Sequence, residues 1–164
     1  MSNRIRLDVN PMMAEYVGPR GIARAELDGM IPALKQAHAA VEAGRGKGMQ
    51  GWMDLPYNQD EIVAEIEKTA AKVRSEFEAF VVLGIGGSAL GPAAVQAALN
   101  HLHYNELPAG KRGGPRLYIE DNIDPERMAA LMDVVDLKKT CFNVITKSGG
   151  TAETMSQYLI VTEA

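Results

Sequence analysis

Hydrophobic residues in the first part of the chain recur with the spacing of an amphipathic helix. Over residues 21–43, one face collects apolar residues three or four positions apart, namely Ile22, Ala25, Leu27, Ile31, Leu34, Ala37 and Val41. This period predicts a helix. Pro32 lies within the run, so we expect a kink, or two helices that meet near Gly29.

A second helical stripe follows a glycine-rich interruption. The segment GRGKGMQG at 44–51 holds four glycines, which predicts a loop. The next helix is expected over 60–78, with an apolar stripe made of Ile62, Ile66, Ala70, Val73 and Phe77. We therefore interpret residues 1–58 as a helical N-terminal arm with a Gly-rich linker, and residues 59–164 as the first part of the main domain.

From residue 79 the pattern changes to short apolar runs that alternate with helical segments. The runs AFVVLGIG, RLYIED and TCFNVIT predict three strands, the first of them buried on both faces. Helices are expected from Ser88 to His101, from Pro125 to Val134 with Asp124 as the cap, and from residue 151 onward. This alternation predicts an α/β fold with right-handed crossovers onto a parallel sheet.

Composition narrows the function classes without choosing among them. Hydrophobic residues make up 46% and charged residues 23%, which is ordinary for a soluble globular protein. The formal net charge of -4 argues against a nucleic-acid partner. Cys141 is the only cysteine, which favours a reducing, cytoplasmic setting, and no apolar stretch reaches membrane-spanning length. We expect a soluble cytoplasmic protein with no membrane partner.

The domain is expected to be truncated. The last helix reaches YLIVTEA with no Gly, Pro or basic residue to mark its end. Three strands would also make a small parallel sheet, whereas such sheets normally have their faces and edges covered.

The first strand is followed by a glycine-rich turn in VLGIGGSALG. Gly84, Gly86 and Gly87 let the backbone approach a ligand or adopt positive φ, and the helix start offers unpaired N–H groups to an anion. Ser88 could cap the helix or donate its hydroxyl to a bound oxygen. A tight structural connection without a ligand is the alternative.

Two nucleotide motifs can be tested at this turn by their spacing. Gly84-x-Gly86-x-x-Ala89 fits the dinucleotide fingerprint, whose acidic partner should follow after about 20 residues. The acidic pair at 120–121 lies some 30 positions beyond the turn instead. The Walker pattern fails because Pro92 stands where its lysine is required. A dinucleotide site is therefore the least favoured interpretation of this turn.

The third strand leads into a second such turn, TKSGGT at 146–151. Lys147 supplies a point charge suited to a phosphate, and Thr146, Ser148 and Thr151 supply hydroxyl donors. The two glycines between them let backbone amides join these donors. In a parallel sheet both turns lie at the carboxyl ends of strands, where ligands bind. The pattern favours a phosphate site; a Ser/Thr-capped helix beside a solvated lysine is the alternative.

At these two turns the chain resembles the phosphoglucose isomerase family, whose core is a sugar isomerase (SIS) fold. The resemblance rests on GIGGSALG at 84–91 and ITKSGGTAET at 145–154, with support from GWMDLP at 51–56 and DNIDP at 121–125. It runs from about residue 45 to the end and corresponds to the N-terminal portion, including the first SIS domain. It implies a three-layer α-β-α parallel sheet behind the helical arm.

The resemblance also implies roles for individual residues. The phosphate of a sugar should be held by Thr146, Lys147, Ser148 and Thr151, with Gly87 and Ser88 lying against it from the first turn. Glu153 matches a position that supports a catalytic histidine located later in the family's sequences. The implied reaction interconverts glucose 6-phosphate and fructose 6-phosphate, in glycolysis and gluconeogenesis, without a metal or nucleotide cofactor.

The proton-transfer groups of that reaction have no counterpart within these 164 residues. In the family the base glutamate, an arginine, the ring-opening histidine and a further lysine lie later in the chain. We therefore expect the phosphate-binding half of a site, inactive by itself, from an enzyme that is a homodimer at full length. The alternative is a non-catalytic regulatory SIS module that binds a phosphosugar.

The remaining candidates are interpreted as structural. His101 and His103 are two positions apart and point to different sides of a helix, so neither they nor His38 predict a metal site. The basic residues of the expected loop at 105–116 read as a solvated connector. Trp52, Tyr57 and the thiol of Cys141 are expected in the core.

Overall fold

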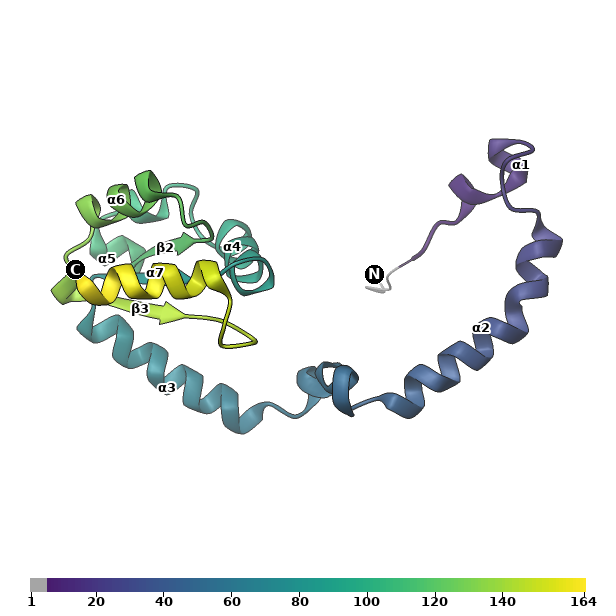
Figure 1. Cartoon of the computed structure of the whole chain (residues 1–164), viewed down its shortest axis with the longest axis horizontal. Helices are drawn as coiled ribbons and strands as arrows, with labels where there is room; N and C mark the ends of the chain where they lie inside the picture. Colours follow the sequence, from purple (N-terminus) through teal and green to yellow (C-terminus); the bar gives the residue numbers. More distant parts are fainter. Residues whose placement is uncertain (1–5) are drawn as a thin grey trace. The chain divides into compact units, whose positions relative to one another are not determined.

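The computed structural model describes residues 6–164, and the chain divides into two compact units between Gln59 and Asp60. Figure 1 labels α helices of both units and the strands β2 and β3 of the second unit. Within residues 6–164, no helix combines the length and the apolar character needed to cross a membrane.

The first unit is helical. Its elements are η1 (Asn10–Met12), α1 (Ala14–Val17), α2 (Arg24–Gly44) and the 3-10 helix η2 (Gly48–Tyr57). α2 continues through Pro32 as a single helix, so the expectation of two helices that meet near Gly29 is wrong. A proline removes one backbone hydrogen bond of a helix, and the turns on either side keep theirs.

The glycine-rich interruption at 44–51 is only partly a loop, because two of its four glycines lie inside η2. Side chains hold the turn that precedes η2: Arg45 Nε donates to Asp54 Oδ1 at 2.7 Å. Gly46 has a φ of 71°, and a Cβ there would collide with the Asp54 carboxylate. A glycine count alone misses this ion pair, which is why the predicted loop was too long.

The two aromatic residues of η2 are not core residues. Trp52 is 67% exposed and Tyr57 is 77% exposed, so the prediction that they lie in the core is wrong. The Tyr57 ring centroid lies 5.6 Å from the Arg45 guanidinium carbon, a cation–π contact within the first unit.

The second unit is built on a parallel sheet. Its strands are β1 (Ala79–Leu83), β2 (Arg116–Glu120) and β3 (Thr140–Val144), in the order β2-β1-β3. In register, Ala79 lies level with Arg116 and with Thr140. The continuous apolar run of β1 puts it at the centre, where both faces are covered. The predicted parallel α/β sheet is confirmed.

Helices cover this sheet on both faces. The helices of this unit are α3 (Asp60–Glu76), α4 (Gly87–Leu99), α5 (Ala109–Arg112), α6 (Pro125–Val134) and α7 (Ala152–Glu163), with the 3-10 turns η3 (Tyr104–Glu106) and η4 (Leu137–Lys139). On one face, Leu131 of α6 belongs to the same buried cluster as Val81, and Val161 of α7 packs against that cluster. α3 runs along the other face (Figure 1), which completes the three predicted layers.

Two local predictions have different outcomes. Asp124 caps α6 as expected, accepting from the backbone N–H groups of Glu126 at 2.8 Å and Arg127 at 3.3 Å. The expected loop at 105–116 instead contains the end of η3 and all of α5. The side-chain amide of Asn105 bonds the backbone N–H and C=O of Leu117, both at 2.7 Å. That amide closes the outer edge of β2 in the way a neighbouring strand would.

The strand order creates a switch point beside β1. The chain leaves β1 for β2 on one side and later crosses to β3 on the other side. β1 and β3 are neighbours, but the chain continues from β1 to β2, on the other side of β1. In open parallel sheets, ligands bind in the crevice at such a switch point. The first turn (84–88) follows β1 and the second turn (146–151) follows β3.

Candidate functional site

The two turns begin side by side at the carboxyl edge of the sheet. Leu83 and Val144 are level in the β1–β3 pairing, and the backbone N–H of Ile145 donates to Leu83 O at 2.9 Å. The residues that follow each strand therefore leave the sheet from adjacent positions. Sequence reasoning expected both turns at this edge, and the strand order makes them neighbours.

The first turn is shaped by its glycines. Gly86 is the N-cap of α4 with a φ of 55°, a conformation that residues with a Cβ rarely adopt. A Cβ on Gly84 would lie 2.9 Å from the Cβ of Ser88, so this close approach also requires glycine. Gly87 is the first residue of α4 and faces open space, because nothing lies within 4 Å of a Cβ placed there.

Ser88 does not cap α4. It is the second residue of the helix, whose N-cap is Gly86 and has no side-chain capping bond. The capping role suggested for Ser88 is therefore wrong, and its hydroxyl is left for a ligand at the helix start. Its backbone N–H donates to Ile85 O at 3.1 Å, which closes the turn.

The second turn gathers three hydroxyls. Thr146 Oγ1 lies 3.1 Å from Thr151 Oγ1, and Ser148 Oγ lies 3.5 Å from the same atom. Backbone amides fold over this cluster, because Gly149 N donates to Thr146 Oγ1 and Gly150 N to Ser148 Oγ, each at 3.2 Å. Three of the predicted phosphate-binding side chains thus form one hydrogen-bonded group.

Thr151 stands at the N-cap of α7, yet its side chain makes no capping bond. Its hydroxyl turns toward Thr146 instead, which leaves the first N–H groups of α7 uncapped. The alternative of a Ser/Thr-capped helix fails on this point. A helix of 12 residues with an uncapped start and a hydroxyl cluster beside it favours an anion.

Lys147 and Glu153 are the two charged residues predicted at this turn. Lys147 is exposed and forms no ion pair with any residue in the described part of the chain. Glu153 is half-buried in the first turn of α7. The ammonium group is therefore free to meet a charged ligand, which an ammonium binds as a point charge.

Behind the two turns lies a buried polar group that sequence reasoning did not identify as part of a site. Glu120, at the end of β2, is buried, and its Oε2 lies 3.1 Å from Arg127 Nη2. Arg127 also donates to Asp121 Oδ1 at 2.8 Å. Burial raises the pKa of the Glu120 carboxyl, and the opposing charge of Arg127 only partly offsets that rise.

This ion pair weakens the dinucleotide interpretation. The acidic residue of that fingerprint must face a ribose hydroxyl. The Glu120 carboxylate is instead buried against Arg127.

Gln157 of α7 lies in the same region and is fully buried. The only signal of it in the sequence is a polar residue three positions after Thr154 on the inward face of the helix.

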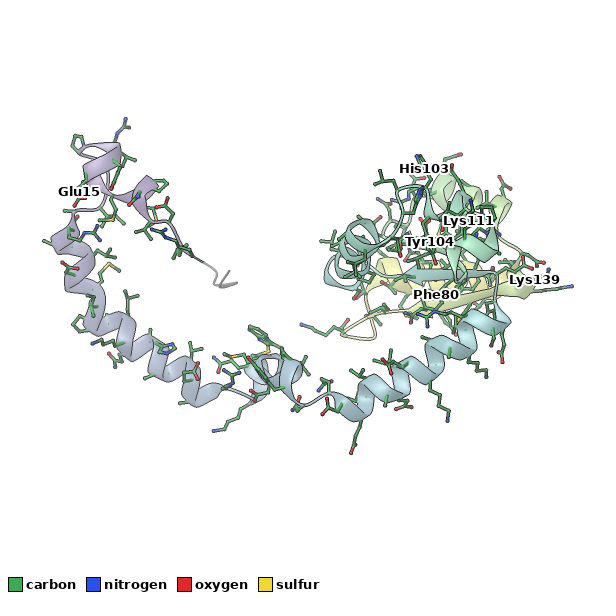
Figure 2. All side chains as sticks on the ribbon, turned by 180° about the vertical axis from the view of Figure 1, so that it is seen from behind. Glu15, Phe80, His103, Tyr104, Lys111 and Lys139 are labelled. Atoms are coloured by element: carbon green, nitrogen blue, oxygen red, sulfur yellow. The ribbon has the colours of Figure 1, made fainter. Side chains whose placement is uncertain are left out.

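The other candidate groups do not form a site. Figure 2 shows His103 and Lys111 on the outside of the second unit, and both are exposed. Among residues 6–164, no cluster of three or more His, Cys, Asp or Glu side chains could hold a metal ion. Arg112 bonds the carbonyls of Leu107 and Gly114, both at 2.8 Å, so it holds its own loop.

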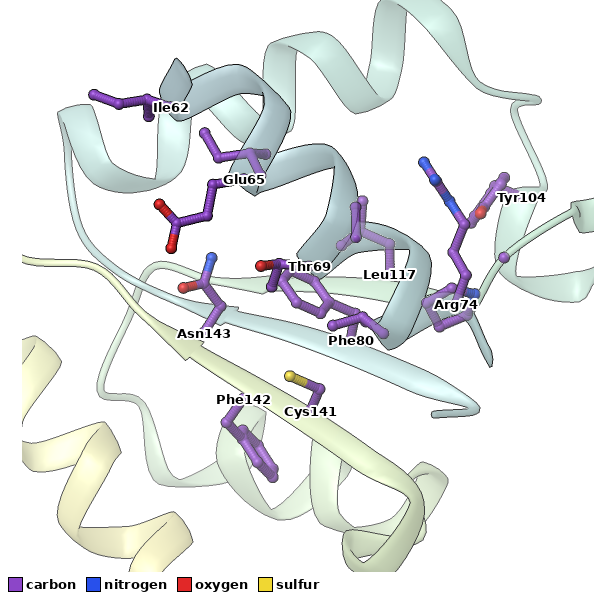
Figure 3. Close-up of a pocket in the computed structure, with 15 residues that line it drawn as sticks. Ile62, Glu65, Thr69, Arg74, Phe80, Tyr104, Leu117, Cys141, Phe142 and Asn143 are labelled. Atoms are coloured by element: carbon purple, nitrogen blue, oxygen red, sulfur yellow. The ribbon is translucent and has the colours of Figure 1, made fainter. Parts of the chain in front are cut away.

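One cavity of the second unit lies away from both turns. It has a volume of about 630 Å³ and lies between α3 and the face of the sheet that carries Phe80 and Cys141 (Figure 3). Its lining is mainly apolar, and burial raises the pKa of the Cys141 thiol, which lowers the fraction present as the reactive thiolate. Such a surface offers little to an anion, so we place the candidate site at the turns.

Comparisons with known proteins identify the family of this chain. The sequence profile described as Phosphoglucose isomerase matches residues 61–164. A glucose-6-phosphate isomerase from Carboxydothermus hydrogenoformans is 54% identical over 159 residues, covering 97% of this chain and 34% of the relative. One from Rubrobacter xylanophilus is 41% identical over 142 residues, covering 86% of this chain and 31% of the relative.

Solved structures give a matching result. A hypothetical protein from Thermus thermophilus superposes with a TM-score of 0.67 at 36% identity, covering 84% of this chain and 30% of that one. A glucose-6-phosphate isomerase from Chlamydia trachomatis superposes with a TM-score of 0.53 at 28% identity, covering 63% of this chain and 18% of that one. The chain spans about a third of the length of the curated relatives it matches.

Proposed function

Because the chain belongs to the phosphoglucose isomerase family and corresponds to the N-terminal portion of its longer relatives, we propose that it supplies the phosphate-binding part of a glucose-6-phosphate isomerase. The observation that carries this proposal is the hydroxyl cluster of Thr146, Ser148 and Thr151, which stands beside the unpaired Lys147. The ligand is the phosphate of a sugar monophosphate.

The second turn holds this phosphate by several charge-assisted hydrogen bonds. Thr146, Ser148 and Thr151 donate their hydroxyls, the uncapped start of α7 donates backbone N–H groups, and Lys147 neutralises the dianion. Each bond to a charged group contributes about 1.5–3 kcal/mol. The turn needs no aromatic surface for this ligand, which distinguishes a phosphosugar from a nucleotide.

The first turn approaches the same ligand from the neighbouring strand. Gly87 faces open space, so a ligand can lie directly against the backbone there. Ser88 adds a hydroxyl that makes no capping hydrogen bond to α4. Two turns on adjacent strands thereby fix one end of the sugar phosphate, and fixing the substrate is itself a large part of catalysis.

The reaction of the complete enzyme is the interconversion of glucose 6-phosphate and fructose 6-phosphate. A base moves a proton between C2 and C1 through an enediol, and a hydroxyl proton moves between O2 and O1, so no atom is gained or lost. Glu153 serves this chemistry indirectly, by supporting a histidine supplied by another part of the enzyme. By itself this chain binds the phosphate and does not catalyse the proton transfer.

Further properties follow from the same proposal. The complete enzyme works in the cytoplasm as a homodimer, and its reaction requires neither a metal nor a nucleotide cofactor. The regulatory alternative, a phosphosugar sensor without catalysis, gains no support from the relatives named above, of which those with a stated activity are isomerases.

A chimera tests the proposed function. The matching 159-residue segment of the Carboxydothermus hydrogenoformans enzyme is replaced with this chain, and isomerisation of fructose 6-phosphate is measured. We expect kcat/KM within about tenfold of the parent enzyme, and a Lys147→Ala chimera with a raised KM. A folded chimera without isomerase activity would contradict the proposal.

A further inference from the structure

Gln157 lies on α7, six residues after Thr151, and its side chain is 0% exposed. We propose that Gln157 is a positioning residue that fixes the second turn relative to the first through a shared backbone carbonyl. This inference rests on the proposed function, because it concerns the geometry of the same phosphate site.

The shared carbonyl is that of Glu120, at the end of β2. Gln157 Nε2 donates to Glu120 O at 3.1 Å and to Asn122 O at 3.0 Å. The backbone N–H of Gly84, in the first turn, donates to the same Glu120 O at 3.2 Å. One oxygen atom therefore accepts from the first turn and from the helix that carries the second turn.

The orientation of the Gln157 amide is determined by these partners. Both acceptors are backbone carbonyls, so only the NH₂ end of the amide can face them. Both of its N–H groups are used, and the bond to Glu120 O is buried while the bond to Asn122 O is partly buried. Loss of such a donor leaves a buried carbonyl with one partner fewer, which is costly compared with the loss of an exposed bond.

These two bonds set the position of α7 in a way that its apolar contacts do not. Val161 packs against the core cluster, but apolar contacts are not directional and tolerate sliding or rotation of the helix. Six residues span about 9 Å along a helix, so a rotation at Gln157 is carried directly to Thr151. A displaced Thr151 would move its hydroxyl away from those of Thr146 and Ser148.

The helix offers a matched control in Thr154. It lies three residues before Gln157, is equally buried at 0% exposed, and its Oγ1 has no hydrogen-bond partner among the described residues. Thr154→Val keeps the shape and removes the hydroxyl. Gln157→Met likewise keeps the length of the side chain and removes the donor, so the two variants differ in whether a tie to Glu120 is lost.

The experiment uses the isotopically labelled 164-residue chain and fructose 6-phosphate, followed by backbone amide NMR shifts. In Gln157→Met we expect the Kd to rise at least fivefold. In the same variant without ligand, the amides of Gly84 and of residues 149–151 should move together. Thr154→Val should leave both readouts at the wild-type values. An unchanged Kd in Gln157→Met, or equal losses in both variants, would overturn the inference.

Two further outcomes are separated in advance. If wild-type protein does not bind fructose 6-phosphate, the proposed function fails, and the ligand-free amides decide: joint movement of Gly84 and residues 149–151 supports the tie, and movement confined to α7 overturns it. If Gln157→Met does not fold, the side-chain NH₂ signals of wild-type Gln157 decide. Their shift on titration, with the same Kd as the second turn, supports the inference, and silence at saturation overturns it.

Discussion

The first and second turns occupy equivalent positions in the fold and differ in their chemistry. Both follow a parallel strand and open a helix, and they leave the sheet from neighbouring strands. The first turn contributes shape, since Gly84 and Gly86 are required by close approach and by positive φ. The second turn contributes donors and charge, through its hydroxyl cluster and Lys147. In a phosphate site built from these turns, the first turn provides open space beside the backbone and the second provides hydrogen-bond donors and a positive charge.

The largest expected effect is the loss of the cation from the second turn. Lys147→Ala should weaken binding of fructose 6-phosphate by about tenfold to a hundredfold, because a charged hydrogen bond contributes about 1.5–3 kcal/mol. The change is measured as Kd by calorimetry or NMR. Lys138→Ala is the matched control, since that exposed lysine lies before β3 rather than after it. Equal losses in both variants would mean that only net charge matters.

Substitution of a positive-φ glycine in the first turn should lower the stability of the fold, whereas substitution in the second turn should weaken ligand binding. Gly86→Ala forces a Cβ into a φ of 55° and should lower the free energy of unfolding by about 1–3 kcal/mol, measured by denaturant titration. Gly87→Ala meets no atom within 4 Å, so the fold should tolerate it while the Kd for fructose 6-phosphate rises. Normal ligand binding by Gly87→Ala would show that the ligand does not approach this backbone.

A third prediction compares a true cap with a residue that only occupies a cap position. Asp124→Ala removes two capping bonds and should cost about 0.5–2 kcal/mol of stability with no change in Kd. Thr151→Val removes a hydroxyl that caps nothing, so stability should change little while the Kd rises several-fold. Both variants need thermal unfolding and ligand titration. A large loss of stability in Thr151→Val would restore the capped-helix interpretation.

The smallest expected effect is a pH dependence from Glu120. Burial raises its folded-state pKa above the unfolded value of about 4.3, so the folded state binds this proton more tightly. The stabilisation is full below that unfolded pKa and is lost as pH rises through the folded pKa. In Glu120→Gln this loss should disappear, so the stability of the variant relative to wild type should increase from pH 4 to 7. Asp121→Asn is the control, and a difference that falls over this range would contradict the assignment.

The sheet could be predicted because its strands have a strong local signal. The run AFVVL has no polar position, so it can only be a strand buried on both faces or a helix, and its length and flanking glycines exclude a helix. The Asp124–Pro125 start of α6 is also encoded locally and was predicted correctly. The length of α2 through Pro32 was not, because one proline does not outweigh the helix-forming residues around it.

The sequence was enough to predict which residues form the candidate site, but it could not predict how their side chains are arranged. The sequence places Thr146 and Thr151 in one turn, but the contact between their hydroxyls is set by the path of the backbone between them, which includes a positive φ at Gly149. Thr151 at the start of a helix resembles a cap, and only the orientation of its side chain shows otherwise. The hydrogen-bonding role of Gln157 could not be predicted, since its partners are backbone carbonyls 35 and 37 residues away, and any residue type can supply a carbonyl.

The central claim is that the second turn holds the phosphate of a sugar, and one titration tests it most directly. The labelled 164-residue chain is titrated with fructose 6-phosphate and separately with NAD, and backbone amide shifts are followed. We expect saturable shifts at Ser88 and over residues 146–151 with the sugar phosphate, none with NAD, and loss of the response in Lys147→Ala. Shifts confined to Gly84–Ala89 with NAD, and no response of the second turn to the sugar phosphate, would contradict the account.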